Sequence, residues 1–163
     1  MRVLITGATG FIGSHVARLL VNRQYEVIAF VRPQSDTWRI EDILSNLRIV
    51  HLDLKDTASV RRQIAQFRPE ICIHLAWYAE PRDYLYSPEN ILHLHASIKL
   101  ARALANKRCA RFIGISSCFE YKVSSEPVSE NQQVWPASNY AQSKCIFKAA
   151  LENISKSKGI QSC

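Results

Sequence analysis

The chain has 163 residues, which is enough for one domain with a hydrophobic core and too few for two ordinary domains. Hydrophobic residues make up 47% of it and charged residues 21%, a globular composition that excludes disordered and fibrous proteins. The net charge of +7 favours anionic partners such as phosphates, but the basic residues are spread along the chain, which argues against nucleic-acid binding.

Strands and helices are predicted in alternation along the chain. In order, the apolar spacing predicts a strand at 3–6, a helix at 11–22, a strand at 26–31, a helix at 36–47 with Asp36 as N-cap, a strand at 48–52, a helix at 57–67, a strand at 71–75, a helix at 88–106, a strand at 111–116, a polar loop at 122–138 and a helix at 139–157. Residues 160–163 look like the approach to a sixth strand.

This alternation predicts an α/β fold with a doubly wound, Rossmann-like parallel sheet. Strands that are apolar on both faces are typical of a parallel sheet covered by helices. Right-handed crossovers leave few other topologies. We expect residues 1–163 to form one domain that is truncated before the sixth strand.

The apolar runs and the cysteines indicate a cytoplasmic protein without a membrane segment or a metal site. No apolar run is longer than a strand, and the first one meets Gly7 too early for a signal peptide. The five cysteines are scattered and form no CxxC motif, which indicates free thiols in a reducing compartment. His93 and His95 do not share a helix face, so structural roles are favoured for them and for His74.

Three of the five glycines, Gly7, Gly10 and Gly13, fall between the first strand and the first helix. This GxxGxxG spacing meets the demands of a dinucleotide-binding loop: a tight turn, close approach of the backbone to a pyrophosphate, and close packing of helix on strand. The N-terminus of the helix adds free N–H groups and a partial positive charge. We therefore predict that residues 7–13, with Phe11 and Ile12, bind the phosphates of a dinucleotide.

The end of the second strand bears on the choice of cofactor. An NAD site usually has a carboxylate there for the ribose 2′-hydroxyl, whereas an NADP site has a nearby arginine for the 2′-phosphate. Val31 occupies the acidic position and Arg32 follows it. NADP is therefore favoured over NAD because guanidinium–phosphate pairing is strong and bidentate, although a solvated charge at the end of a strand is the alternative interpretation of Arg32.

Tyr140 and Lys144 stand four residues apart, which places a phenol and an ammonium on one face of the last predicted helix. With the glycine loop, they make the sequence similar to the extended short-chain dehydrogenase/reductase family, in its NAD-dependent nucleotide-sugar epimerase/dehydratase group. The resemblance is carried, in family order and spacing, by Thr6–Gly13, Asp53-Leu54, His74–Ala76, Ser116-Ser117 and Pro136–Lys144. It covers the N-terminal portion of the family only, and it implies that a C-terminal substrate domain is missing.

The resemblance implies roles for individual residues. Tyr140 would be the general acid/base, Lys144 would bind the nicotinamide ribose and lower the pKa of the tyrosine, and Ser117 would hydrogen-bond the reacting oxygen. Asp53 and Leu54 would flank the adenine. The expected cofactor-binding set is completed by Leu75, by Ala76 at the nicotinamide ribose, and by Gly7, Gly10, Phe11, Ile12, Gly13, Arg32, Tyr140 and Lys144.

The sequence departs from the family pattern in two places. His93 occupies the position of a usual asparagine, with Asn90 one turn earlier as an alternative. The Asp-Glu pair that dehydratases of this group use to eliminate water is replaced by Cys118-Phe119, and Glu120, one residue later, is interpreted as a loop charge. We therefore expect an epimerase rather than a dehydratase, with a 4-ketoreductase as the other open possibility.

The sequence thus predicts an NAD(P)-dependent oxidoreductase that acts on the hydroxyl or ketone of a nucleotide-sugar. The alternative is a truncated or non-catalytic NAD(P)-binding module, because the part of the family that holds the nucleotide and sugar is missing. The resemblance also implies that a homodimer is possible. A serine hydrolase is disfavoured because residues 114–118 lack the second glycine of a nucleophile elbow.

Overall fold

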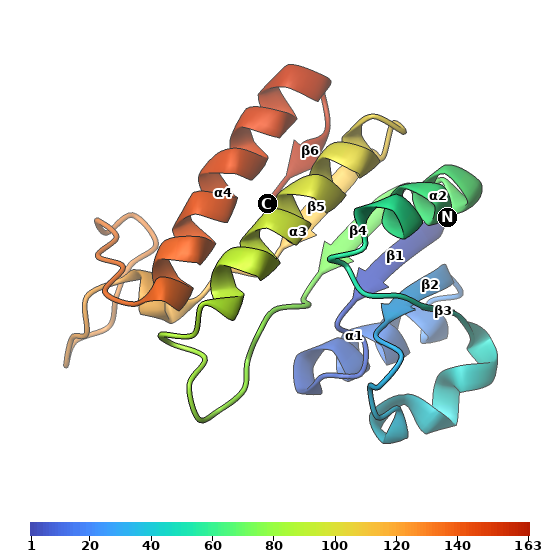
Figure 1. Cartoon of the computed structure of the whole chain (residues 1–163), viewed down its shortest axis with the longest axis horizontal. Helices are drawn as coiled ribbons and strands as arrows, with labels where there is room; N and C mark the ends of the chain where they lie inside the picture. The colour runs from blue at the N-terminus through green and yellow to red at the C-terminus, as the bar shows by residue number, and fades with distance from the viewer.

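The computed structural model describes residues 1–163 and contains one six-stranded, fully parallel sheet (Figure 1). Its order is β3-β2-β1-β4-β5-β6, with strands β1 (Arg2–Thr6), β2 (Glu26–Val31), β3 (Leu47–His51), β4 (Ile71–His74), β5 (Arg111–Gly114) and β6 (Gln161–Ser162). The α-helices are α1 (Phe11–Asn22), α2 (Thr57–Phe67), α3 (Glu89–Ala105) and α4 (Asn139–Lys158), and two short 3-10 helices are η1 (Trp38–Asn46) and η2 (Cys118–Glu120). The predicted doubly wound fold is confirmed.

Helices cover the two faces of the sheet with separate hydrophobic clusters. Leu4 and Ile28 face the larger cluster, to which α2, α3 and α4 contribute. Ile5 and Ala29, the next residues along the same strands, face the smaller cluster under α1 and η1. This alternation is the two-residue period of a strand buried on both faces, and it explains why these strands are unbroken apolar runs in the sequence.

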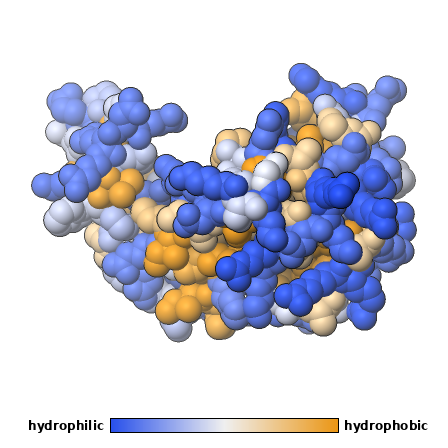
Figure 2. All heavy atoms as spheres, turned by 90° about the horizontal axis from the view of Figure 1, so that it is seen from above, coloured by the Kyte–Doolittle hydropathy of each residue, from blue (hydrophilic) through white to orange (hydrophobic).

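The molecule is longer than it is thick, and the polar segment between η2 and α4 projects from one end (Figure 1). Seen from above, its outline has a deep notch, and most of the visible face is hydrophilic around a hydrophobic group of atoms (Figure 2). None of its helices combines the length and the apolar character that crossing a membrane requires.

The segment predicted as a helix at 36–47 is shorter and is wound as a 3-10 helix. Its N-cap is Thr37 rather than Asp36, whose carboxylate instead accepts a hydrogen bond from the Trp38 backbone N–H at 3.0 Å. The two buried residues of η1, Ile40 and Ile43, are three positions apart, and three residues per turn bring them onto one face. The apolar spacing therefore identified a helix but not its winding.

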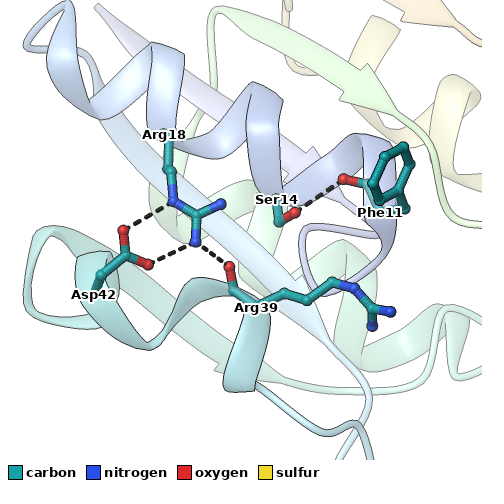
Figure 3. Close-up of polar contacts among 5 residues, drawn as sticks. All are labelled: Phe11, Ser14, Arg18, Arg39 and Asp42. Carbon is teal, nitrogen blue, oxygen red and sulfur yellow. Dashed lines mark hydrogen bonds and ion pairs between the residues drawn. The ribbon is translucent and has the colours of Figure 1, made fainter.

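An arginine of α1 holds η1 in place. The Arg18 guanidinium makes two hydrogen bonds to the Asp42 carboxylate, at 2.8 and 2.7 Å, and also donates to the Arg39 carbonyl oxygen (Figure 3). The Arg39 side chain points away from this pair in the same view. Because both charged side chains are partly exposed, the pair fixes orientation more than it adds stability.

Strands β4 and β5 end one and two residues earlier than predicted, at His74 and Gly114. The residues that follow them leave the sheet and line a pocket at its carboxyl edge. Two of residues 160–163, expected as the approach to a sixth strand, already pair with β5 as β6.

His74 anchors the end of β4 through a buried chain of hydrogen bonds. Its Nδ1 lies 2.7 Å from the Thr6 hydroxyl and its Nε2 lies 2.8 Å from the Ser97 hydroxyl. Ser97 donates to the His93 carbonyl oxygen, so it accepts from His74, which assigns the proton to Nε2. Burial, with the nearby charge of Lys144, lowers the pKa of His74 to about 3. The imidazole is therefore neutral and structural.

This buried imidazole predicts a loss of stability in mild acid. Its pKa in the fold, about 3, lies below the ordinary histidine value of 6.5. The unfolded chain therefore takes up a proton that the fold does not, and the free energy of unfolding falls as the pH drops below 6.5, by about 1.4 kcal/mol per pH unit from this group. Chemical unfolding between pH 7 and about 4 measures this slope.

His74→Asn removes the titrating ring. We therefore expect the free energy of unfolding of this variant to change less steeply with pH than that of the wild type, by the contribution of about one proton. His95→Asn, at an exposed position on the same helix as Ser97, is the matched control and keeps the wild-type slope. Equal slopes for wild type and His74→Asn would contradict the assignment.

Candidate functional site

A pocket lies at the carboxyl edge of the sheet, where the strand order reverses between β1 and β4. Ligands of open α/β folds bind at this point. Its volume is about 480 Å³. Every residue that we predicted to bind a cofactor lines it: Gly7, Gly10, Phe11, Ile12, Gly13, Arg32, Asp53, Leu54, Leu75, Ala76, Tyr140 and Lys144.

The glycine loop can form only because two side chains are absent. Gly7 has a φ of +75°, and a Cβ there would lie 2.8 Å from the Ala76 backbone nitrogen. A Cβ on Gly13 would lie 2.0 Å from the Gly7 carbonyl oxygen. The first turn of α1 therefore rests directly on the loop, and the loop rests on the chain that leaves β4.

The N-terminus of α1 is left without a cap from the protein. Gly10 holds the N-cap position without a side-chain hydrogen bond, and the first turn carries no acidic residue. The Ser14 hydroxyl donates to the Phe11 carbonyl oxygen at 2.9 Å instead of accepting from the first N–H groups (Figure 3). These N–H groups and the helix dipole are available to an anion at the pocket wall, so the loop fits a pyrophosphate.

The chain after β2 presents a cation to the pocket. Val31 is buried and cannot act in place of a carboxylate, whereas Arg32 is exposed and lines the pocket. Ser35, which the sequence did not single out, lines the pocket beside it, because the Ser35 backbone N–H donates to the Arg32 carbonyl oxygen at 3.0 Å and closes a turn.

Tyr140 and Lys144 enter the pocket from the first turns of α4. The Ser138 hydroxyl caps this helix by accepting from the Ala141 backbone N–H at 3.2 Å. Burial raises the pKa of Tyr140, and hydrogen bonding to Ser117 partly offsets this. Ser117 does not line the pocket, but it lies beside the phenol that it was predicted to assist.

Lys144 is a buried cation in this structure. Only 7% of it is exposed, and its Nζ donates to the Ile115 carbonyl oxygen at 2.9 Å. Burial lowers its pKa to about 8, while the negative charge of Glu120 acts in the opposite direction. A substantial share of Lys144 therefore stays charged near neutral pH, facing the same pocket as the phenol.

Trp77 is a pocket residue that sequence reasoning missed. The Lys144 Nζ lies 4.1 Å from the centre of its indole ring, within the range of a cation–π interaction. Its Nε1 donates to the Asn90 side-chain oxygen at 3.0 Å. The signal was an aromatic residue directly after the His74–Ala76 motif, at a point where the chain leaves the sheet.

The two candidates for the family asparagine have separate positions. Asn90 is fully buried, and its amide nitrogen donates to the carbonyl oxygens of Tyr84 and Ser87. Because its oxygen is bound to Trp77, all its polar atoms serve the chain itself. His93, not Asn90, lines the pocket, and burial lowers its pKa.

Glu120 is not a solvated loop charge. It is 2% exposed, and its carboxylate accepts from the Ser116 hydroxyl and, at 3.1 Å, from the Ser117 backbone N–H. The sequence did not indicate its burial, because a glutamate after the fifth strand is ordinarily exposed. Cys118 and Phe119, which stand at the positions of the dehydratase carboxylates, are exposed.

A parallel doubly wound sheet with a glycine loop at its switch point defines a class of dinucleotide-binding proteins. Within this class, the chain belongs to the NAD dependent epimerase/dehydratase family, whose sequence profile matches residues 3–163. Its members among the relatives below are epimerases and dehydratases, so this is a family of enzymes. The resemblance inferred from the motifs is confirmed.

Individual relatives agree with this assignment. A probable UDP-glucuronate 4-epimerase of Rhizobium meliloti (strain 1021) is 35% identical over 120 residues, which are 66% of this chain and 35% of that protein. A GDP-mannose 4,6 dehydratase of Arabidopsis thaliana is 27% identical, and the match covers 98% of this chain and 48% of that protein. The chain therefore spans about half the length, or less, of these curated relatives.

A solved structure shows the same fold. The UDP-glucose 4-epimerase of Thermus thermophilus, crystallised in complex with NAD, has a TM-score of 0.86 and 28% sequence identity to this chain. The match covers 99% of this chain and 53% of that one.

The close contact at Gly13 predicts that Gly13→Ala abolishes cofactor binding. The added Cβ would meet the Gly7 carbonyl oxygen at 2.0 Å, so the loop and the first turn of α1 must separate. We expect the affinity for NAD(P)H, measured by calorimetric titration, to fall below detection while far-ultraviolet circular dichroism stays close to that of the wild type.

Gly159→Ala is the matched control. Gly159 ends α4 at a φ of +69°, outside the pocket lining, so this change strains the backbone without filling space. It should lower stability by about 1 kcal/mol and leave affinity unchanged. Tight binding by Gly13→Ala would show that the loop does not hold the cofactor.

Proposed function

We propose that this chain forms the cofactor-binding part of an NAD(P)-dependent epimerase or 4-ketoreductase that acts on a nucleotide-sugar. The observation that carries this proposal is one pocket, which is lined by the glycine loop at the uncapped N-terminus of α1 and by Tyr140 and Lys144. The glycine loop fits a pyrophosphate, and the phenol and ammonium fit proton transfer to and from a sugar oxygen. The names of the relatives, which include UDP-sugar 4-epimerases, support the substrate class.

In the proposed mechanism, the cofactor would lie along the pocket with its phosphates on residues 7–13. A nicotinamide bound there supplies hydride transfer. Tyr140 takes the proton from the sugar hydroxyl during oxidation and returns it to the ketone during reduction. Lys144 stabilises the phenolate through its positive charge and hydrogen-bonds the ribose, while Ser117 holds the reacting oxygen beside the phenol.

The exposed residues after Ser117 support epimerisation or ketone reduction over dehydration. Elimination of water needs an acid and a base facing the sugar, and Cys118 and Phe119 do not supply this carboxylate pair. Glu120, the one carboxylate of η2, is turned inward to Ser116 and Ser117.

A non-catalytic NAD(P)-binding module is the second candidate. It is favoured by the contacts of Lys144, whose ammonium is held by the Ile115 carbonyl and the Trp77 ring. In such a module the pocket would bind cofactor, but no sugar would be oriented against Tyr140.

We further propose that the site prefers NADP to NAD. Arg32 is exposed at the pocket end where an NAD site usually has a carboxylate, and Ser35 lies on the same turn. A guanidinium and a hydroxyl together suit a ribose phosphate better than a ribose hydroxyl.

Arg32→Asp tests the cofactor preference. Wild-type protein should bind NADPH more tightly than NADH, and the variant should lose at least about tenfold in NADPH affinity because a carboxylate replaces a charge-assisted hydrogen-bond donor. Titration of both cofactors measures this. Arg39→Asp, the same charge change at an arginine outside the pocket lining, should keep the preference. Equal affinities of the wild type for NADPH and NADH would exclude a preference for NADP.

Tyr140→Phe tests the proton-transfer role. In the full natural chain, assayed with nucleotide-linked hydroxy- and keto-sugars, turnover should fall by about a hundredfold or more while cofactor affinity changes little. Tyr86→Phe, at a tyrosine that is 69% exposed, is the control and should keep full activity. Activity that survives the loss of the Tyr140 hydroxyl would refute this mechanism. Cofactor binding by a wild type that turns over no sugar would favour the binding module.

A further inference from the structure

Lys144 and Glu120 are the only Asp, Glu, Lys or Arg residues that are buried in this structure. They stand on α4 and η2, which pack against each other beside the pocket. A buried charge is costly unless it is paired or hydrogen-bonded. The proposed mechanism uses Lys144 and leaves Glu120 without a role.

The contacts of Glu120 lead directly to the pocket. Its carboxylate accepts from the hydroxyl of Ser116, which lines the pocket, and from the backbone N–H of Ser117, which lies beside the Tyr140 phenol. The backbone carbonyl oxygen of Glu120 also accepts from the Trp135 N–H at 2.7 Å. Glu120 is therefore fixed from both its side chain and its backbone, and it fixes the segment that follows β5.

We propose that Glu120 is a positioning residue for the catalytic pair: its carboxylate holds Ser116 at the pocket and Ser117 beside the Tyr140 phenol, and it is the buried counter-charge of the Lys144 ammonium. This inference rests on the proposed function of Tyr140 and Lys144. It concerns a residue outside the pocket lining, which acts through other residues rather than on substrate.

Three titratable groups of α4 are affected by the charge of Glu120: Tyr140, Lys144 and Cys145. Lys144 is the cation among these three. Within η2 itself, Cys118 is exposed. The negative charge of Glu120 raises the pKa of Lys144 and also that of Tyr140. Removing this charge should therefore lower both pKa values together, which loss of a merely structural contact would not do.

The pH dependence of cofactor binding measures this effect without any turnover. If the Lys144 ammonium binds the ribose, affinity weakens as the pH rises through the pKa of Lys144, which is about 8. Without the counter-charge, the ammonium is lost at lower pH. The midpoint of the affinity loss should therefore move down.

The test compares the NADPH affinity of wild type and Glu120→Gln between pH 6 and about 10. Glutamine keeps the size of the side chain and an oxygen that accepts from Ser116 and Ser117, but not the charge. We expect a midpoint near 8 for wild type and one lower by about half a unit or more for the variant. Glu126→Gln, the same change at an exposed position of the following loop, should keep the wild-type midpoint.

Glu120→Asp keeps the charge but withdraws it by one methylene, so its midpoint should move in the same direction by less. Circular dichroism shows whether Glu120→Gln folds. If it does not, Glu120→Asp is the variant that tests the inference. An unmoved midpoint in either folded variant overturns the inference. A wild type that binds neither NADPH nor NADH at any pH instead overturns the proposed function, and the inference with it.

Discussion

The pocket depends on close contacts between backbone segments, which form only because Gly7 and Gly13 have no side chains. The first turn of α1 sits on the Gly7 carbonyl at Gly13, and the loop at Gly7 sits on the chain that leaves β4. Segments distant in sequence thereby meet at the point where the strand order reverses. Because this contact brings α1 so close, its unpaired N–H groups face the same space as the residues that follow β4 and β5 and those of α4.

The polar groups around this contact are paired in a way that separates structural from chemical roles. His74 is held neutral by burial and has both ring nitrogens bound to Thr6 and Ser97, so it fixes the end of β4. The amide of Asn90 is bound to Trp77 and to the preceding loop. Lys144 keeps its charge in the pocket, between the Trp77 ring and a backbone carbonyl, with Glu120 nearby.

Much of this arrangement could be predicted from the sequence because periodic patterns and glycine spacing report on backbone geometry. The strand–helix order predicted the sheet, and the glycines predicted the loop. The winding of η1 could not be predicted, since Ile40 and Ile43 suit either helix type. Trp77 and Glu120 were missed or misinterpreted because their roles depend on partners elsewhere in the chain or on burial, which a single sequence does not display.

Binding of one anionic dinucleotide across the glycine loop and the Tyr140–Lys144 face of α4 is the central claim. Mapping backbone amide shifts by NMR during titration with NADP⁺ tests it most directly. We expect large shifts at residues 10–13, at Arg32 and at 140–144, with little change in the α3–α4 groove around Arg102 and Asn153. Shifts centred on that groove, or none at the glycine loop, would contradict the claim.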